Sequence, residues 1–194
     1  MEKIGIFGGT FNPPHMGHIE AAKSAIRLAG LDRLILVPSN IPPHKILPVN
    51  TANNEQRLLM THMAAEEIGC EVSAIELMRE GKSYTKDTIA FLAAKYPNDS
   101  LYFIMGTDML RTFENWYCPD EILKHCTLLA LCRNEAEREN MLVYKANIEK
   151  NLGGNVIVVE NEVLEVSSTD IRTKNSNLIP QSIANYIDKM GLYK

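Results

Sequence analysis

The sequence lacks any excess of positive charge. It has 20 Lys and Arg against 24 Asp and Glu, so its formal net charge is -4. Proteins that bind DNA or RNA through the phosphate backbone present a basic face, which this balance does not offer. We therefore expect no nucleic-acid partner. Any anion site has to be local and built from a few Lys, Arg and His side chains.

Long apolar runs are also missing. No stretch approaches the ~20 apolar residues that a membrane-crossing helix needs. The chain begins Met-Glu-Lys and passes directly into a short apolar run, which is not the pattern of a secretory signal. The sequence therefore predicts a cytoplasmic protein with no membrane partner.

Cysteine is scarce, with four residues and no C-x-x-C pair. Cys126 and Cys132 flank an apolar run and are expected to be small buried side chains. A zinc site made from Cys118, His125 and Cys126 is an alternative, although their spacing matches no usual zinc pattern. Reduced thiols are the expectation.

The chain does have a regular alternation of two patterns. Short apolar runs rich in Ile, Val and Leu predict strands at 3–7, 34–37, 71–75, 101–105, 127–131 and 156–159. Helical patterns lie near 18–29, 54–68, 85–96, 135–150, 169–174 and 180–190. This alternation predicts an α/β fold, Rossmann-like and doubly wound, with a mostly parallel sheet and helices on both faces.

The length suits one compact unit. A chain of 194 residues that is 45% hydrophobic can bury one core but is short for two. We expect a single domain over 1–194, in which 1–165 form the α/β core and 166–194 form a small C-terminal helical cap. Ligands of such sheets bind outside the carboxyl ends of the strands, so segments that follow strands are the candidates for a site.

The segment after the first strand is the most informative one. Its sequence is GGTFNPPHMGH, at residues 8–18. Glycines let backbone N–H groups approach a ligand, and the helix N-terminus that follows favours an anion. His15 and His18 are three residues apart, so on a helix they share a face and can both donate to a phosphoryl oxygen. The plainer alternative is a helix-capping turn with two surface histidines.

Two other phosphate-binding loops are excluded by spacing. Gly5, Gly8 and Gly9 do not fit the G-x-G-x-x-G pattern of dinucleotide-binding folds. No G-x-x-x-x-G-K-[ST] loop is present either. The turn at 8–18 is therefore a different phosphate motif, with histidines in place of the lysine.

A second candidate begins at Ser167. As plain structure, Ser167 caps a helix and Asp170 replaces the usual Glu of a capping box. The hydroxyls of Ser168 and Thr169, the free N–H groups of a helix start and the planar donor Arg172 can also bind phosphate. Paired with the first turn, this segment is interpreted as the other side of a triphosphate site.

These segments resemble the nucleotidyltransferases that carry an H-x-G-H element. GGTFNPPHMGH is similar to their G-x-F-x-P-x-H-x-G-H signature, and VSSTDIR at 166–172 is similar to I-S-S-T-x-I-R. Asn12 and Val166 depart from the frequent Asp and Ile of these signatures. Within the superfamily, the chain resembles the bacterial nicotinate-mononucleotide adenylyltransferases, on PPHK at 42–45, SYTKDT at 83–88, G-T-D at 106–108 and Trp116-Tyr117.

The resemblance implies transfer of the adenylyl group of ATP to nicotinate mononucleotide, which gives nicotinate adenine dinucleotide and pyrophosphate in NAD biosynthesis. It implies catalytic roles for His15, His18, Lys45 and Arg172. It implies ATP contacts from Gly8, Gly9, Thr10, Phe11, His18, Gly106, Asp108, Ser168, Thr169 and Arg172. For nicotinate mononucleotide it implies contacts from His15, Lys45, Ser83, Tyr84, Thr85, Trp116, Tyr117 and Arg133.

The resemblance also implies Mg²⁺ carried by the ATP phosphates, with no metal site assigned to the protein, and it allows for a homodimer. Arg57 is a softer candidate beside Lys45 and Arg133. Three structural alternatives stay open: Lys45 as a solvated lysine, Asp108 as a helix cap and Trp116 as a core residue. Two other functions stay open as well, a related transferase acting on pantetheine phosphate or another small phosphate, and a sensor that binds an adenine nucleotide without turnover.

Overall fold

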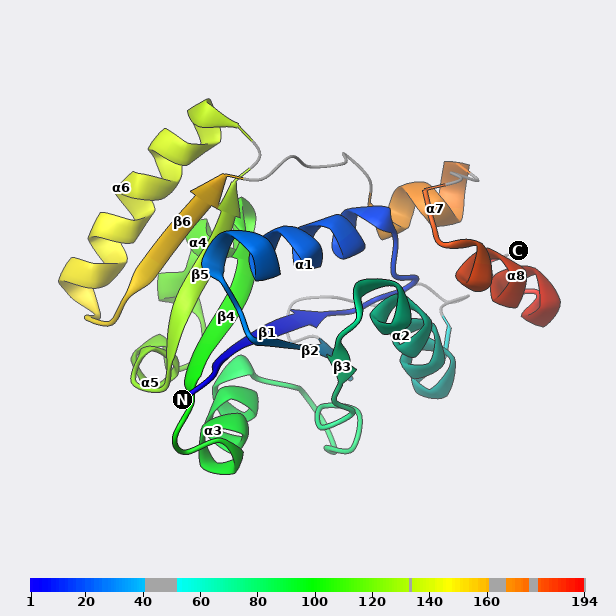
Figure 1. The fold of residues 1–194 in the computed structure, drawn as a ribbon, viewed down its shortest axis with the longest axis horizontal. Coiled ribbons are helices and arrows are strands. Elements are labelled where there is room, and N and C mark those ends of the chain that lie inside the picture. The colour runs from blue at the N-terminus through cyan, green and yellow to red at the C-terminus, as the bar shows by residue number, and fades with distance from the viewer. Residues whose placement is uncertain (41–51, 133, 161–166, 175–177, 194) are drawn as a thin grey trace.

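The computed structural model describes residues 1–40, 52–132, 134–160, 167–174 and 178–193 (Figure 1). Its centre is a six-stranded sheet in which every neighbouring pair runs parallel. The strands are β1 (Lys3–Gly9), β2 (Arg33–Pro38), β3 (Glu71–Val72), β4 (Ser100–Gly106), β5 (Cys126–Cys132) and β6 (Val156–Glu160). Their order is β3-β2-β1-β4-β5-β6, the doubly wound order, so the predicted fold class is confirmed.

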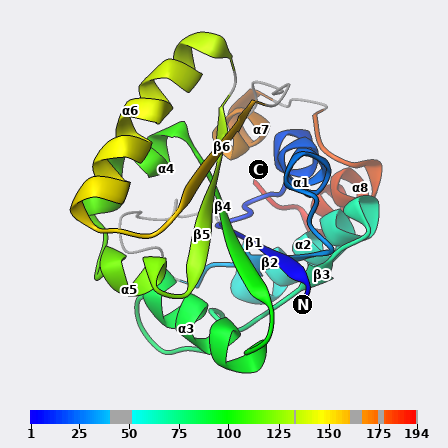
Figure 2. The same ribbon diagram turned by 60° about the vertical axis from the view of Figure 1, so that its left-hand side comes forward.

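Helices cover both faces of the sheet (Figure 2). One face carries α1 (Met16–Ala29) and α2 (Asn54–Ile68). The other carries α3 (Thr85–Lys95), α4 (Thr107–Thr112), α5 (Pro119–Leu123) and α6 (Glu135–Asn151). The last two helices, α7 (Ser168–Lys174) and α8 (Gln181–Met190), lie at the end of the molecule where α1 begins (Figure 1).

The core follows from alternation along the strands. Ile4 and Ile6 of β1 point to the face covered by α3–α6, whereas Leu34 and Leu36 of β2 point to the face covered by α1 and α2. Strands with apolar residues in both directions are those of a sheet buried on both sides. A third cluster joins α1, α2 and α8 through Ile19, Met60 and Ile183. The C-terminal helices are thus packed onto the core beside the first turn.

The structure differs from the sequence prediction at four short elements. Strand β3 has only two residues, because the chain leaves the sheet after Val72 and enters a turn in which Met78 N–H donates to the Ala74 carbonyl at 3.1 Å. Between β4 and β5 the structure contains α4, a 3-10 turn at Phe113–Asn115 and α5, none of which was predicted. Elements this short carry too few residues for a helical period to show.

The sheet reverses its winding between β1 and β4, which are neighbours at its centre. In doubly wound sheets, a crevice forms outside the carboxyl ends of the strands at this point. The segment 8–18 follows β1, and Gly106 to Asp108 follow β4. The topology therefore brings two of the predicted segments to the same edge of the sheet.

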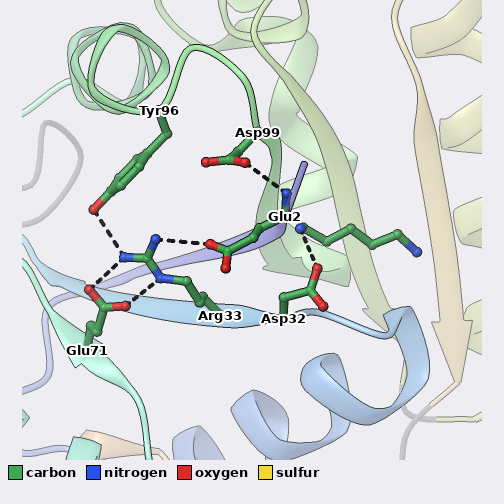
Figure 3. A network of polar contacts seen from close by, with 7 residues as sticks. Glu2, Asp32, Arg33, Glu71, Tyr96 and Asp99 are labelled. Carbon is green, nitrogen blue, oxygen red and sulfur yellow. Dashed lines mark hydrogen bonds and ion pairs between the residues drawn. The ribbon is translucent and has the colours of Figure 1, made fainter.

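The opposite edge carries a polar network centred on Arg33 (Figure 3). Its guanidinium donates to both carboxylate oxygens of Glu71, at 2.7 and 3.0 Å, and to Glu2 at 3.2 Å. The Tyr96 hydroxyl lies 3.4 Å from the same group. The network ties the amino ends of β1, β2 and β3 together with the end of α3, far along the strands from the predicted site.

Of the helices in the described ranges, none is both long enough and apolar enough to span a bilayer.

Two of the cysteines, Cys126 and Cys132, are the first and last residues of β5. Cys126 and Cys132 are buried, as predicted, and burial raises the pKa of the Cys126 thiol to about 12. The Cys126 thiol donates to the Ile122 carbonyl at 3.4 Å, and the part of the chain that is described contains no group of three potential ligands that could hold a metal ion. The zinc alternative therefore gains no support.

Candidate active site

Two hydrogen bonds to backbone carbonyls hold the turn after β1 in place. The Gly9 carbonyl accepts from the Ser39 N–H at 2.9 Å, and the Thr10 carbonyl accepts from Arg57 Nη1 at 2.7 Å. In a planar trans peptide, the N–H points away from the carbonyl of the same unit. The N–H groups of Thr10 and Phe11 are therefore directed to the other side of the turn, away from Ser39 and Arg57.

Phe11 gives this turn its shape. Its φ is 47°, in the left-handed region that a large side chain rarely adopts, and its side chain is buried. Such strain persists only where the surroundings enforce it, and it is concentrated at functional sites. The ring lies directly against Gly9, where an added Cβ would approach it to 2.9 Å. Gly9 is thus required by close contact with Phe11.

The two predicted histidines lie together. His15 is the N-cap of α1 and His18 is in its first turn, with ring centroids 3.7 Å apart. The backbone N–H of His15 donates to Nδ1 of His18 at 3.2 Å. Because Nδ1 acts as the acceptor, the proton of a neutral His18 ring belongs on Nε2, which makes Nε2 a hydrogen-bond donor.

His15 is held in its neutral form by its surroundings. The side chain is 6% exposed, and burial lowers its pKa to about 4, with the nearby Asp170 carboxylate offsetting part of the effect. Its Nδ1 atom is buried and has no hydrogen-bond partner among the described residues. A buried polar atom without a partner is costly. His15 is therefore a neutral imidazole enclosed in the turn, with its ring beside that of His18.

The second signature lies directly against the first. Arg172 Nη1 donates to the Asn12 carbonyl at 2.6 Å, and the Ser168 hydroxyl donates to the Pro13 carbonyl at 2.9 Å. Arg172 Nη2 also contacts the Thr169 hydroxyl at 3.1 Å. Segments about 155 to 160 residues apart in the sequence are thus parts of one site.

The helix that carries Arg172 is capped as predicted. The Ser167 hydroxyl accepts from the Asp170 N–H at 3.1 Å, and the Asp170 carboxylate accepts from the Ser167 N–H, also at 3.1 Å. This is a capping box with Asp in the place of Glu. The structural interpretation of this segment and the functional one are compatible, because Ser167 and Asp170 make the cap while Ser168 and Arg172 face the turn.

Arg57, the softer candidate, lies in the interior of the protein. Its side chain is fully buried, and burial lowers the pKa of its guanidinium. Besides the Thr10 carbonyl, it donates to the Asn54 side chain at 2.7 Å. Arg57 therefore supports the turn from inside the protein, and we do not propose it as a substrate contact.

A chain of amide groups continues from Arg57 toward α3. The Asn54 amide donates to the Asn40 side chain at 2.8 Å, and the Asn40 amide donates to the Arg79 carbonyl at 2.8 Å. Arg79 in turn donates to the Thr88 hydroxyl at 2.8 Å. The segment 83–88 is thereby tied to the turn after β1. The sequence singled out neither Asn40 nor Arg79, although both adjoin predicted motifs.

The start of α3 is anchored on a buried carboxyl group. Glu76 is 8% exposed, accepts from the Thr88 hydroxyl at 2.8 Å, and has its pKa raised by burial. The Ser83 hydroxyl, which is buried, donates to the Glu76 carbonyl at 3.5 Å. Ser83 thus positions the backbone before α3, and Tyr84 is the N-cap residue from which the helix begins at Thr85.

Two aromatic side chains meet beside this helix start. The Tyr84 and Tyr117 rings have centroids 4.8 Å apart, and Lys86 Nζ lies 5.2 Å from the Tyr117 ring centroid. Tyr117 is 56% exposed, so the pair lies at the surface of the protein. Trp116 packs at the edge of the core, with its ring centroid 5.4 Å from that of Phe113. Trp116 is therefore partly a core residue, in agreement with the alternative that gives it a structural role.

Gly106 and Asp108 lie where β4 ends. Gly106 is the N-cap of α4, and Asp108 is in the first turn of that helix. The Asp108 side chain is exposed and lies 3.3 Å from Arg111 in an ion pair. Asp108 is thus not the cap residue, and its carboxylate is accessible from solvent. Lys45, the PPHK segment and Arg133 lie outside the described residues.

Comparisons with known proteins agree on one family. The cytidylyltransferase-like family matches residues 6–174. A Clostridium novyi protein named "Probable nicotinate-nucleotide adenylyltransferase" is 38% identical over the full length of both chains, and the nicotinate-nucleotide adenylyltransferase of Bacillus subtilis is 35% identical, again over both full lengths.

A solved structure shares the fold at lower identity. It is Plasmodium falciparum nicotinic acid mononucleotide adenylyltransferase complexed with NaAD, with a TM-score of 0.76 and 18% identity, covering 100% of this chain and 98% of its own. The chain described here belongs to the cytidylyltransferase-like family and, within it, to the nicotinate-nucleotide adenylyltransferases.

Proposed function

We propose that this chain transfers the adenylyl group of ATP to nicotinate mononucleotide between the turn after β1 and the start of α7. The observation that carries the proposal is the 2.6 Å hydrogen bond from Arg172 to the Asn12 carbonyl, because it joins the two signatures of the family in one site. The products are nicotinate adenine dinucleotide and pyrophosphate. The reaction is a step of NAD biosynthesis.

The nucleophile needs no general base. A phosphomonoester oxygen of nicotinate mononucleotide is already ionised near neutral pH and attacks the α-phosphorus of ATP in line. The new O–P bond forms as the bond from the α-phosphorus to the β-phosphate oxygen breaks, and pyrophosphate leaves with that electron pair. The protein has to bring two anions together and neutralise the charge that develops.

The residues around the turn supply donors for that task. Backbone N–H groups of Thr10 and Phe11 would hold phosphate oxygens, as would the hydroxyl of Thr169. His18 is assigned the Nε2–H contact with the α-phosphate, where charge develops in the transition state. Arg172 keeps further N–H donors besides the two it uses on Asn12 and Thr169, and these are assigned to the β- and γ-phosphates.

The mononucleotide is assigned to a place beside the ATP, at the same edge of the sheet. His15 and Lys45 are proposed for its phosphate, and Arg133 is a further candidate. The nicotinate ring would bind at Trp116 and the Tyr84–Tyr117 pair, with its carboxylate on the backbone N–H groups of Thr85 and Tyr117. Gly106 and Asp108 are proposed for the ATP ribose, since an exposed carboxylate can accept from its hydroxyls.

Mg²⁺ is proposed to arrive on the phosphates of ATP, where it would stabilise the leaving pyrophosphate. His15, His18 and Arg172 are assigned to phosphate oxygens as hydrogen-bond donors, and no metal contact is assigned to them. The oxygen ligands that magnesium prefers would therefore come from phosphates and water. The remaining proposed residues are Gly8, Ser83 and Ser168. Gly8 would act through its backbone, whereas the hydroxyls of Ser83 and Ser168 support the segment before α3 and the turn after β1.

The direct test is a pyrophosphate-release assay with ATP, Mg²⁺ and a panel of phosphate acceptors. We expect release with nicotinate mononucleotide and much slower release with nicotinamide mononucleotide or pantetheine phosphate. Release with pantetheine phosphate in place of the mononucleotide would identify the related transferase. ATP binding without release for any acceptor would identify a nucleotide sensor.

Replacing His18 by Ala removes the donor assigned to the α-phosphate. We expect kcat to fall by about 100-fold or more, whereas ATP affinity changes by less than about tenfold, because the contact strengthens in the transition state. The surface variant His62→Ala on α2 is the matched control and should retain wild-type rates. Near-normal turnover by the His18 variant would contradict this role.

The depressed pKa of His15 predicts a specific loss of stability in acid. Between the ordinary pKa of 6.5 and about 4, the unfolded chain binds a proton at this position that the folded chain does not. With respect to His15, the free energy of unfolding is therefore at its full value above pH 6.5. It decreases by about 3 kcal/mol as the pH falls toward 4. Urea denaturation across this range measures it.

The variant His15→Gln is the control for that titration, because its side chain does not ionise. Its free energy of unfolding should fall less steeply than that of the wild type between pH 6.5 and pH 4. Parallel curves for the two proteins would show that His15 does not have its pKa lowered in the folded state.

A further inference from the structure

The segment after α8 folds back onto the helices beside the nucleotide turn. Gly191 ends α8 with a φ of 63°, and the Leu192 N–H donates to the Ile187 carbonyl at 3.0 Å. This is the hydrogen-bond pattern by which a glycine in the left-handed conformation reverses the chain after a helix. Leu192 and Tyr193 then pack on the cluster formed by α1, α2 and α8.

Tyr193 reaches from this cluster into the signature turn. Its hydroxyl donates to Oδ1 of Asn12 at 2.7 Å, across 181 residues of sequence. Asn12 is 2% exposed, so the acceptor residue is buried and the bond is partly so. The φ of Tyr193 is 61°, a conformation that a tyrosine rarely adopts. The backbone is thus held in an unusual state at the residue that makes this contact.

We propose that Tyr193 is a positioning residue for the nucleotide site, whose hydroxyl fixes Asn12 and through it the carbonyl that Arg172 grips. The inference rests on the proposed function and adds to it a residue outside both signatures. Its role is to act through Asn12, without contact with the substrates.

The geometry explains how one hydroxyl can affect the site. Two hydrogen bonds hold Asn12, one from Tyr193 to its side chain and one from Arg172 to its backbone carbonyl. The next residue, Pro13, is held through its carbonyl by Ser168. A shift of Asn12 would therefore move the guanidinium and the start of α7 together. Such a shift changes the placement of phosphate donors without unfolding anything.

The surroundings keep the tyrosine in the state that can donate. Burial is the main cause that raises the pKa of the Tyr193 hydroxyl, while the charges of Arg172 and Arg57 act in the opposite direction. The hydroxyl stays protonated and its oxygen faces a cationic environment. It therefore has one proton to give, and the Asn12 carboxamide oxygen receives it.

The test compares Tyr193→Phe with Tyr96→Phe. Both remove one hydrogen-bonding hydroxyl and keep the ring, but Tyr96 belongs to the Arg33 network at the far edge of the sheet. For Tyr193→Phe we expect kcat/KM for ATP to fall about five- to tenfold, the usual worth of one hydrogen bond in a rate. Tyr96→Phe should leave it unchanged, while both variants show similar urea midpoints.

A double-mutant cycle assigns the effect to Asn12. In an Asn12→Ala background the contact no longer exists, so Tyr193→Phe should cause no further loss. In an Asn12→Asp background an oxygen acceptor remains, and Tyr193→Phe should again lower kcat/KM for ATP. Equal losses from Tyr193→Phe in the Asn12→Ala and wild-type backgrounds would overturn the proposal.

The proposal is also overturned if Tyr193→Phe retains wild-type kcat/KM, or if its loss is matched by Tyr96→Phe. Failure of the proposed function has a separate signature, since the wild type itself would then release no pyrophosphate. In that case calorimetry with ATP decides the positioning role: weaker ATP binding by Tyr193→Phe supports it, and equal binding overturns it.

Discussion

The hydrogen bond from Arg172 to the Asn12 carbonyl is the contact on which the site depends. It holds the start of α7 against the turn after β1, and the Ser168 hydroxyl adds a second bond to the next residue. The Asn12 carbonyl is part of the backbone, so it points toward the Arg172 guanidinium only when the turn has its correct shape. The contact between the two signature segments therefore requires that the turn is folded.

The shape of the turn after β1 is set by buried side chains that pack against it or bind its backbone. Buried Arg57 grips the Thr10 carbonyl, and Phe11 sits in a left-handed conformation against Gly9. Nη1 and Nη2 of the buried guanidinium donate to the Thr10 carbonyl and the Asn54 side chain, and these two bonds set its position, whereas its Nε has no partner among the described residues. The parallel sheet supplies the remaining constraint, because its reversal between β1 and β4 fixes where the site opens.

The sequence predicted the parts of this arrangement that repeat or that follow local rules. Apolar periodicity predicted the sheet and its long helices. The cap at Ser167 was predictable because its partner, Asp170, is only three residues away. Long-range contacts had no such signal. The burial of Arg57 depends on tertiary packing, and Tyr193 meets Asn12 across nearly the whole chain. The short helices α4 and α5 lacked the length to show a period.

The most direct measurement is a crystal structure with a non-hydrolysable ATP analogue and Mg²⁺. We predict the triphosphate between His18 and Arg172, with an α-phosphate oxygen within hydrogen-bonding distance of His18 Nε2 and a β- or γ-phosphate oxygen on Arg172, while Arg172 stays on the Asn12 carbonyl. A triphosphate bound away from the turn after β1, or one that contacts only one of the two side chains, would contradict the account.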